Sequence, residues 1–343
     1  MKSNDIAKKE KNQNILINIK NINIMKKIVN SFNKVRLYEI IRYNKKLQKR
    51  FHLSFEDYKE YSEIYSLIEI EIIPAKNKYG KFININKNDE KYFHIYFNNN
   101  KKEEIKRSNL IQKEKVSKIN IIINHQIKTF NGLFYNCECI EFILFKKFYR
   151  TNINNMTDMF WNCSSLKKIK FNFFKTSGIN DMSYMFNECK SLEELDLSNF
   201  DTSNVTNMSG IFYGCKSLNE INLSNIDTNN VEDMSYMFYE CSSLESLNIS
   251  NFNINHVINM NYMFSGCSSL QNINFPQFNT NNDNEIETID MFKGCISLNG
   301  LDISNLIINP LASPSAGAPA LNYGDVNTVT PSPGEVKGLM KER

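Results

Sequence analysis

Apolar and polar positions recur with one period along the stretch from Phe130 to Leu306. Six of its cysteines lie 26 residues apart and a seventh follows after 28, namely Cys137, Cys163, Cys189, Cys215, Cys241, Cys267 and Cys295. A fixed period of about 20–50 residues is typical of supersecondary units that bury a continuous core only when stacked. The pattern therefore predicts an α/β repeat solenoid of seven units.

Each unit divides into two segments of different hydrophobic period. In residues 182–192, apolar side chains fall at i, i+3, i+4, i+7 and i+10, which predicts about two to three turns of helix on the convex side. Leu195 and Leu197 alternate with polar residues, which predicts a short strand. Because strands this short are unstable alone, we expect them to pair in parallel as a concave sheet. The matching pairs are Ile169/Phe171, Ile221/Leu223, Leu247/Ile249, Ile273/Phe275 and Leu301/Ile303.

The chain outside the repeats is expected to hold a helical head, a β-hairpin and two disordered ends. Helical spacing predicts helices at 22–32, 35–50 and 54–72, and alternation predicts hairpin strands at 81–85 and 92–97. The repeats are expected to begin at Ile119, which lies three periods before Leu197. The predicted segments are a disordered lead-in (1–20), a helical head or cap (21–73), a β-hairpin and connector (74–118), repeats (119–310) and a disordered tail (311–343).

Charge divides unevenly along the chain. Residues 1–150 carry 31 Lys/Arg against 16 Asp/Glu, whereas residues 151–310 carry 7 against 18. The first half could form an electrostatic surface for nucleic acid or anionic lipid. Its lysines are scattered and its arginines scarce, so we interpret it as a solvated surface and do not expect nucleic-acid binding. The acidic repeats favour a protein partner that is basic.

The cysteines are expected to be small buried hydrophobes. They occupy one position in each unit, where neighbouring helices would pack about 8–10 Å apart, beyond the reach of a disulfide. Cys137 and Cys139 lack the spacing and nearby histidine of a zinc site. We expect no metal and no cofactor. Residues 1–30 contain no continuous apolar run, and no stretch is long enough to span a bilayer, so we expect a cytoplasmic protein.

A binding role is expected to lie on the concave strand face. Its outward positions are acidic or carry amides, and the candidate partner-binding residues are Lys170, Glu193, Glu194, Asp196, Glu220, Asn222, Glu245, Asn248, Asn274 and Asp302. An equally good alternative is that the Asn and Asp side chains have only a structural role and hydrogen-bond to the backbone of stacked turns and strand edges. Tyr184, Tyr236 and Tyr262 recur at one position of the repeat, and each is followed two residues later by a Phe. We expect these Phe side chains to be buried in the core and the Tyr side chains to be partly exposed. We see no catalytic motif and expect no enzyme and no small-molecule substrate.

The motifs of the repeats resemble those of a known family. Val205-Thr206-Asn207-Met208, Met237-Phe238-x-x-Cys241, Ser243-Leu244, Leu247-x-Ile249-Ser250 and Phe200-Asp201-Thr202 resemble the BspA-type leucine-rich repeats, also described as the DUF285 repeat of mycoplasma proteins. The resemblance covers residues 119–306. It implies a right-handed solenoid that binds proteins, and members of the family are often surface adhesion proteins.

Two roles remain open for the helical head. It is either a cap on a monomeric binding module or a recruitment site, which would make the chain an adaptor. Helices ahead of leucine-rich repeats resemble an F-box followed by substrate-binding repeats, which would imply a ubiquitin-ligase partner. The leading Leu-Pro of that motif is replaced by Asn21-Ile22-Asn23-Ile24.

Overall fold

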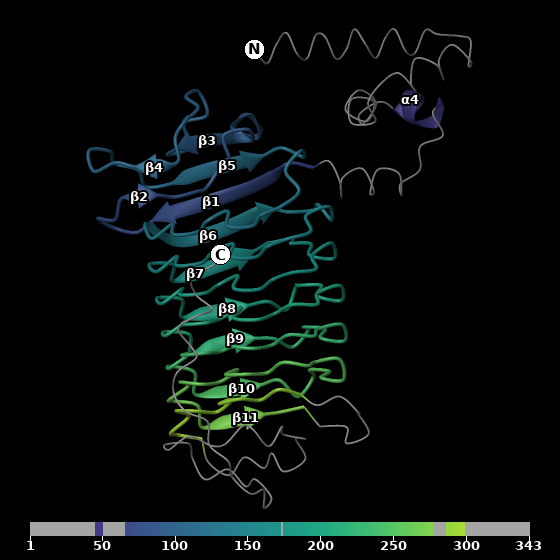
Figure 1. Cartoon of the computed structure of the whole chain (residues 1–343). Coiled ribbons are helices and arrows are strands. Elements are labelled where there is room, and N and C mark those ends of the chain that lie inside the picture. Colours follow the sequence, from purple (N-terminus) through teal and green to yellow (C-terminus); the bar gives the residue numbers. More distant parts are fainter. Residues whose placement is uncertain (1–44, 51–65, 173, 277–285, 299–343) are drawn as a thin grey trace, which may run out of the picture. The chain divides into compact units, whose positions relative to one another are not determined.

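The computed structural model describes residues 45–50, 66–172, 174–276 and 286–298, and the chain divides into two units after Leu67 (Figure 1). The first unit contains helix α4 (Lys45–Arg50), with Leu47 buried. Of the predicted head (21–73), residues 21–44 and 51–65 lie outside the described residues, as do the lead-in and the tail, so the predictions for these segments stay open. No helix among the described residues is long and apolar enough to cross a membrane.

The described part of the second unit, from Ile68 onward, is mostly β-structure with almost no helix. One 3₁₀ turn is described there, η1 (Glu90–Tyr92). The strands are β1 (Ile68–Pro74), β2 (Gly80–Lys81), β3 (Phe93–Phe97), β4 (Asn109–Leu110), β5 (Ile119–Ile123), β6 (Ile140–Lys147), β7 (Lys168–Phe171), β8 (Glu194–Asp196), β9 (Glu220–Asn222), β10 (Ser246–Asn248) and β11 (Asn272–Asn274).

Strand β1 shows that the predicted helix at 54–72 is wrong from Ile68 onward, whereas residues 54–65 lie outside the described residues. It lies between β5 and β6 in a five-stranded sheet of order β3-β5-β1-β6-β7 and runs antiparallel to both neighbours. Ile68, Ile70 and Ile72 are buried at 0%, 1% and 0% exposure. They alternate with the glutamates Glu69 and Glu71. β-branched residues at a period of two favour a strand, and the paired neighbours on both sides stabilise that conformation.

The predicted β-hairpin is also wrong. Strand β2 pairs antiparallel with β4, and β3 pairs antiparallel with β5, so the two expected hairpin strands lie in different sheets. Strand β5, expected to be the first parallel strand of the repeats, pairs antiparallel with β1 and β3. Its alternating burial is the same in either direction. Hydrophobic period alone therefore does not distinguish the two pairings.

Glu71 on β1 links three adjacent strands electrostatically. The residue is 7% exposed, and its carboxylate pairs with Lys118, which precedes β5, at 2.8 Å and with Lys146 on β6. Burial acts to raise the pKa of Glu71, but the hydrogen bonds from the two lysines outweigh it, so the net pKa is lowered. The sheet therefore buries a charge with its partners in place, which is the condition for tolerating one.

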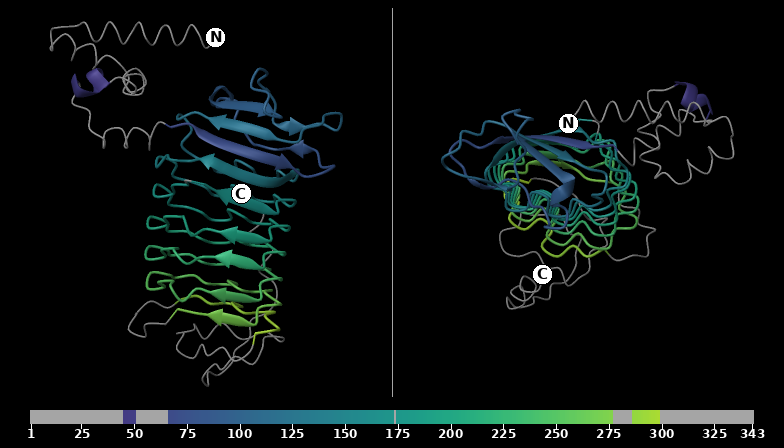
Figure 2. Two further views of the ribbon diagram at one scale, coloured as in Figure 1. Left: turned by 180° about the vertical axis from the view of Figure 1, so that it is seen from behind. Right: turned by 90° about the horizontal axis from the view of Figure 1, so that it is seen from above.

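From β6 onward, each repeat unit makes one circuit of the chain, which we call a coil. Coils are numbered 1 to 7 by their cysteines, from Cys137 to Cys295. Strands of adjacent coils pair in parallel with a 26-residue offset in β6–β7, β8–β9 and β10–β11 (Figures 1 and 2). A second line of parallel bridges connects coils 2 to 7 elsewhere in the circuit. Its residues are Asn155, Asp181, Asn207, Asp233, Asn259 and Glu287.

The segment predicted as a convex helix is instead a series of turns, which we call the turn segment (residues 182–190 in coil 3). Alternate N–H groups leave the coil. Those of Tyr184 and Phe186 donate to carbonyls of the next coil at 2.9 Å each. The groups between them bond three residues back within the coil, as Met185 does to Met182 at 3.3 Å. An α-helix needs every N–H to bond four residues back, so this alternation excludes one.

The backbone reason is a pair of left-handed residues in each turn segment. In coil 3 these are Tyr184 (φ 54°) and Glu188 (φ 57°). The first position recurs as Gly132, Asp158, Tyr184, Gly210, Tyr236, Tyr262 and Asp290. The second recurs as Asn136, Asn162, Glu188, Gly214, Glu240, Gly266 and Gly294. Glycine, asparagine and aspartate adopt positive φ most readily, and they occupy most of these positions.

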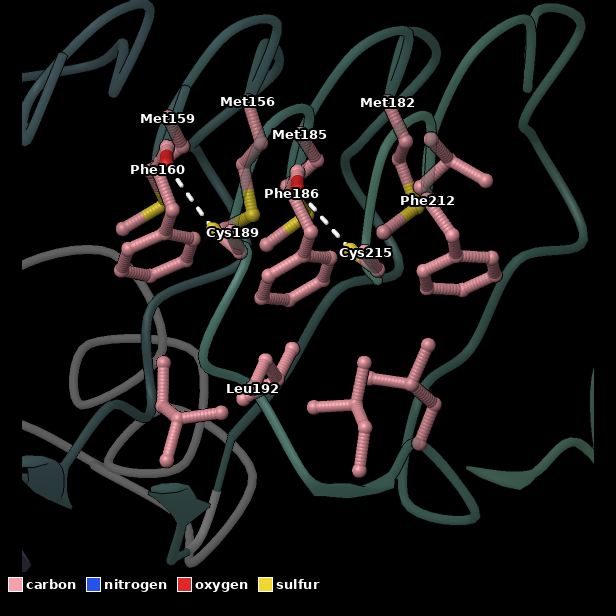
Figure 3. Packing of buried hydrophobic residues seen from close by; sticks show 14 of the residues in the cluster. Met156, Met159, Phe160, Met182, Met185, Phe186, Cys189, Leu192, Phe212 and Cys215 are labelled. Carbon is pink, nitrogen blue, oxygen red and sulfur yellow. Dashed lines mark hydrogen bonds between the residues drawn. The ribbon is translucent and has the colours of Figure 1, made fainter. Parts of the chain in front are cut away.

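Stacked side chains fill the core between strands and turn segments (Figure 3). The ring centroids of Phe160 and Phe186 lie 5.1 Å apart at an interplanar angle of 8°. The Cys189 Sγ donates to the Phe160 carbonyl of the preceding coil at 3.1 Å, and the same bond recurs for each of the next coils. All eight cysteines are free and buried. Their predicted position in the core is confirmed, although the surrounding segment is not helical.

Candidate binding surfaces

Most predicted partner-binding residues come together on one surface, which we call the strand face. Along β7 to β11, Leu195 and Leu247 point inward at 3% and 5% exposure. The positions after these inward residues are exposed in coils 2 to 6, namely Lys170, Asp196, Asn222, Asn248 and Asn274. Beside them, Glu193, Glu220 and Glu245 are exposed and Glu194 is half-buried. Asp302 lies outside the described residues.

The Asp and Asn side chains of the strand face also hold local turns. The Oδ1 atoms of Asp196, Asn222 and Asn248 accept hydrogen bonds from backbone N–H groups two residues later, at 2.9, 3.1 and 3.2 Å. This is the bonding pattern expected of an Asx turn. The structural role predicted for this column is therefore present, and it uses only part of the acceptor capacity of each side chain.

The glutamates of the strand face differ in their ion pairing. Glu194 pairs with Lys168 of the preceding coil. Within the described part of the chain, Glu193, Glu220 and Glu245 make no ion pair with a lysine, arginine or histidine. Their carboxylates are exposed on coils 3, 4 and 5. An unpaired row of carboxylates attracts a cationic ligand and makes its binding depend on salt.

Other polar columns are committed to joining the coils. The Thr202 hydroxyl donates to the Asp227 carbonyl and accepts from the Asp227 N–H, both at 2.8 Å. Thr176 and Thr228 make the same pair of bonds, and all three threonines are 1% exposed. Because donor and acceptor are both used and buried, this column is structural.

A shallow depression of about 420 Å³ crosses coils 4 to 6. Its lining residues are Asn204, Thr206, Asn230, Glu232, His256 and Ile258. The amide groups of Asn204 and Asn230 already donate to Ser177 and Ser203 carbonyls at 2.8 and 2.6 Å. The depression therefore offers few free polar groups that converge on one point, as a small-ligand site requires.

A row of aromatic side chains on the turn segments was only partly predicted. We call it the aromatic ladder, and it comprises Tyr135, Trp161, Tyr184, Tyr213, Tyr236, Tyr239 and Tyr262. Tyr135 is 38% exposed and the others are half-buried, whereas Phe186, Phe238 and Phe264 are fully buried. The expected division between inner Phe and outer Tyr is therefore confirmed. Four members, Tyr135, Trp161, Tyr213 and Tyr239, were missed.

Three of the four missed members, Tyr135, Trp161 and Tyr213, have a detectable sequence signal. Where the first left-handed position is Gly132, Asp158 or Gly210, an aromatic residue follows three residues later. Where that position is Tyr184, the later one is Asn187. In coils 1 to 6 each coil thus contributes at least one outer ring. The Tyr184 ring lies over Gly210 and occupies the space that a Cβ would need there.

The rings of the ladder contact one another along the stack. Centroid distances are 5.7 Å for Tyr135–Trp161, 5.5 Å for Trp161–Tyr184, 4.6 Å for Tyr213–Tyr239 and 5.0 Å for Tyr236–Tyr262. The last two pairs are stacked, at interplanar angles of 18° and 10°. The rings of these two pairs therefore cover much of each other's faces, whereas Tyr135–Trp161 and Trp161–Tyr184 are tilted at 38°.

The ladder and the ion pairs beside it carry little net charge. Burial raises the pKa of Tyr213 and Tyr236 to about 12 each, with neighbouring tyrosines contributing, so both hydroxyls stay protonated near neutral pH. The charged groups beside the ladder pair with one another, as Lys190 does with Glu188 at 2.7 Å and Lys216 with Glu240 at 2.8 Å. Lys293 pairs with Asp290 at 2.8 Å.

Comparison with known proteins places the repeats in a family without an assigned activity. Residues 128–222 and 219–310 match the family model described as "Mycoplasma protein of unknown function, DUF285". No curated protein and no solved structure matches the chain. The two matched regions together span residues 128–310, which is more than half of the 343 residues and includes coils 2 to 7. The chain belongs to the DUF285 family.

Proposed function

We propose that the repeats form a right-handed solenoid of the BspA-like leucine-rich type, and that the solenoid is a non-enzymatic module that binds a basic protein partner. The observation that supports this most is the set of exposed, unpaired carboxylates on adjacent coils of the strand face. Glu193, Glu220 and Glu245 lie on rigid strands or immediately beside them, as a preorganised site requires.

The size of the strand face limits the mode of binding. Strands of about four residues, about 4.8 Å apart over seven coils, offer a few hundred Å², which is below the roughly 800 Å² per partner of a standard interface. The partner therefore contacts adjoining loops as well, or binds with modest affinity and fast, charge-steered association. A flexible basic segment suits this surface.

The proposal is tested by reversing the charge of the strand face. The triple variant Glu193→Lys, Glu220→Lys and Glu245→Lys should fold like the unaltered chain, because all three side chains are exposed. Full-length bait would capture partners from a native lysate, and mass spectrometry would identify them. We expect the triple variant to bind a basic partner at least tenfold more weakly than the unaltered chain does. For the unaltered chain, we expect the affinity to decrease as salt is added.

The matched control is Glu232→Lys, an exposed carboxylate on the flank of coil 5. It changes charge without touching the strand face and should leave the partner's affinity unchanged. Equal binding by the triple variant and the unaltered chain would rule out the strand face as the binding surface. The F-box-like adaptor, the adhesion role and the cytoplasmic location stay predictions.

A further inference from the structure

The described part of the stack ends, at coil 7, in a row of backbone donors. In coil 6, four alternate N–H groups donate to carbonyls of coil 7 at 2.7 to 2.9 Å, and they belong to Met260, Tyr262, Phe264 and Gly266. The equivalent residues of coil 7 are Thr288, Asp290, Phe292 and Gly294. Their N–H groups have no acceptor among the residues that the structure describes. Inter-coil N–H groups of the turn segments point from each coil to the next, so this edge offers donors only.

We propose that residues 313–319 of the same chain cap this edge. In this arrangement the segment is extended, and its backbone carbonyls accept hydrogen bonds from the four N–H groups of coil 7. We call residues 313–319 the capping segment. The proposal is independent of the strand face, because it concerns the end of the stack. It departs from the predicted disordered tail (311–343) only for these residues.

Coil 7 differs from the other coils at three positions of its turn segment, and each difference favours a cover. Ile289 and Ile296 are exposed at 41% and 70%, although coils 1 to 6 carry polar residues at both positions. Thr288 stands where coils 2 to 6 carry a buried methionine. It is 6% exposed, and its hydroxyl has no hydrogen-bond partner within the described residues. Exposed isoleucines and a buried, unpaired hydroxyl beside free N–H groups indicate a surface that another segment completes.

The burial of the coil 7 core indicates that the cover belongs to the same chain. Met291, Phe292 and Leu298 are 4%, 2% and 1% exposed. Stacked units bury such side chains by contact with the units on both sides, and the described residues include no coil beyond the seventh. We therefore assign the cover to chain that follows Leu298.

The repeat spacing brings the capping segment to the position of a next turn segment. Leu192 of coil 3 is followed after 15 residues by Asn207, the bridge residue of coil 4, and Ser313 follows Leu298 at the same spacing. The apolar residues of this stretch match those of coil 3. They are Leu301, Ile303, Leu306 and Leu311, in the places of Leu195, Leu197, Phe200 and Val205.

The same spacing gives each donor an acceptor. In coils 1 to 5, a turn-segment N–H donates to the carbonyl 25 residues later, as Tyr184 does to Ser209 at 2.9 Å. Applied to coil 7, this offset pairs the four N–H groups in order with the carbonyls of Ser313, Ser315, Gly317 and Pro319. Every residue, proline included, carries a backbone carbonyl, so the capping segment supplies all four acceptors.

The composition of the capping segment suits a cap made of backbone. It reads Ser-Pro-Ser-Ala-Gly-Ala-Pro, so it lacks the Met, Phe and Cys side chains that fill the core of the coils, and it ends the stack. Pro314 stands in register with Met208, whose N–H donates to coil 5 at 2.9 Å. Proline has no N–H, and its place on an exposed edge discourages the addition of further strands.

The direction of the hydrogen bonds argues against a second copy of the chain as the occupant. Two coil 7 edges related by a twofold axis would place donors against donors. A head-to-tail contact would need the free carbonyls of coil 1. Asn84 already occupies that edge, because its N–H donates to the Leu133 carbonyl at 2.8 Å and its Nδ2 to the Tyr135 carbonyl at 2.7 Å. The start of the stack is thus capped from within the chain, as we propose for its end.

Hydrogen exchange of the four coil 7 amides, measured by NMR in the full chain, tests the proposal. We expect each amide to exchange at least tenfold more slowly than in an unstructured peptide, at a rate that does not change on dilution of the protein. A chain truncated after Ala312 should lose this protection, whereas a chain truncated after Ala320 should keep it. The amides of Tyr184 and Phe186 in coil 3 should stay protected in both, which verifies folding.

A second variant loosens the cap without shortening the chain. Ile289→Ser with Ile296→Ser introduces the residues that coil 5 carries at these positions, Ser235 and Ser242, so coil 7 should still form. We expect the four amides to exchange at least twofold faster. The matched control is Ile258→Ser, an exposed isoleucine of coil 6 at 52%, which should leave their exchange unchanged.

Three results would overturn the inference. The first is exchange of the four amides in the full chain as fast as in an unstructured peptide. The second is full protection in the chain truncated after Ala312, which would show that residues 313–319 are not the cap. The third is protection that disappears on dilution, which would identify a second copy as the occupant.

Discussion

At the scale of single residues, backbone conformation decides the structure of the turn segment. Met182, Met185, Phe186 and Cys189 have the spacing of one helical face, and all four are buried as a helix would bury them. The left-handed residue between Met182 and Met185 breaks the helix without moving these side chains out of the core. Tyr184 and the equivalent tyrosines occupy a conformation that costs a non-glycine residue about 1–2 kcal/mol, and the inter-coil hydrogen bonds stabilise it.

The contact between Tyr184 and Gly210 provides a test with an internal control. Gly132 and Gly210 occupy the same position with φ 58° and 57°, so alanine costs the same backbone strain at both. Space differs, because a Cβ at Gly132 meets only Tyr135 Cβ at 3.6 Å, whereas at Gly210 it meets the Tyr184 ring. In urea unfolding, Gly210→Ala should reduce the free energy of unfolding by about 1–3 kcal/mol more than Gly132→Ala does, which is the usual cost of overpacking. Combining it with Tyr184→Ala should remove that excess. Equal losses in the two single variants would contradict the ring position.

At the scale of elements, the sequence predicts strands well wherever a period of two is repeated at the same place in each coil. The pairs Leu195/Leu197 and Leu247/Ile249 are buried as expected. The hydrophobic period does not predict which strands pair with each other. Strand β1 has the composition of a strand, but the preceding residues have helical spacing, and nothing local indicates that β5 and β6 would enclose it. On the strand face, the exposed positions followed from alternation, whereas the Asx turns and unpaired glutamates required the structure.

The position of β1 predicts where the second unit can be cut. Because β1 bonds to β5 on one side and β6 on the other, its removal leaves both with unpaired edges next to the buried Ile121 and Ile143. A fragment of residues 66–310 should be soluble and unfold cooperatively. A fragment of residues 75–310 should aggregate or lose protection of β5 and β6 amides in hydrogen exchange. If both fragments are equally protected, β1 is dispensable and the sheet closes without it.

At the scale of the whole molecule, stability depends on contacts that repeat along the coils. The eight buried thiols have raised pKa values because burial disfavours the thiolate, with Cys139 at about 11 and Cys295 at about 12. In an unfolded chain these thiols ionise near pH 9. Above that pH the unfolded state therefore binds fewer protons than the folded state, so the free energy of unfolding decreases as pH rises.

The thiols therefore predict a loss of stability on the alkaline side. Each thiol that ionises only on unfolding contributes up to about 1.4 kcal/mol per pH unit. The free energy of unfolding, measured in urea between pH 8 and 9, should decline steeply. This range lies below the pKa of about 10 at which the tyrosines of the unfolded chain ionise. The Cys189→Ser variant should decline less steeply, because a hydroxyl can donate to the same Phe160 carbonyl without ionising. A free energy of unfolding that does not change with pH, or rapid alkylation of the thiols in the folded protein at pH 8, would contradict their burial.

The offset of 26 residues between coils 1 to 6 has a consequence for the length of the chain. Every inter-coil bond, whether from a backbone N–H, a threonine hydroxyl or a cysteine thiol, joins a coil only to its immediate neighbour. Deleting residues 208–233 would join Asn207 to Met234, and the motif Met-Ser-Tyr-Met-Phe would follow in the place of Met-Ser-Gly-Ile-Phe. The new junction restores the backbone, hydroxyl and thiol bonds between neighbouring coils, although Tyr236 takes the place of Gly210 beside the Tyr184 ring. Molecules of this type can therefore gain or lose whole coils in one genetic event, and the number of coils becomes a variable independent of the fold.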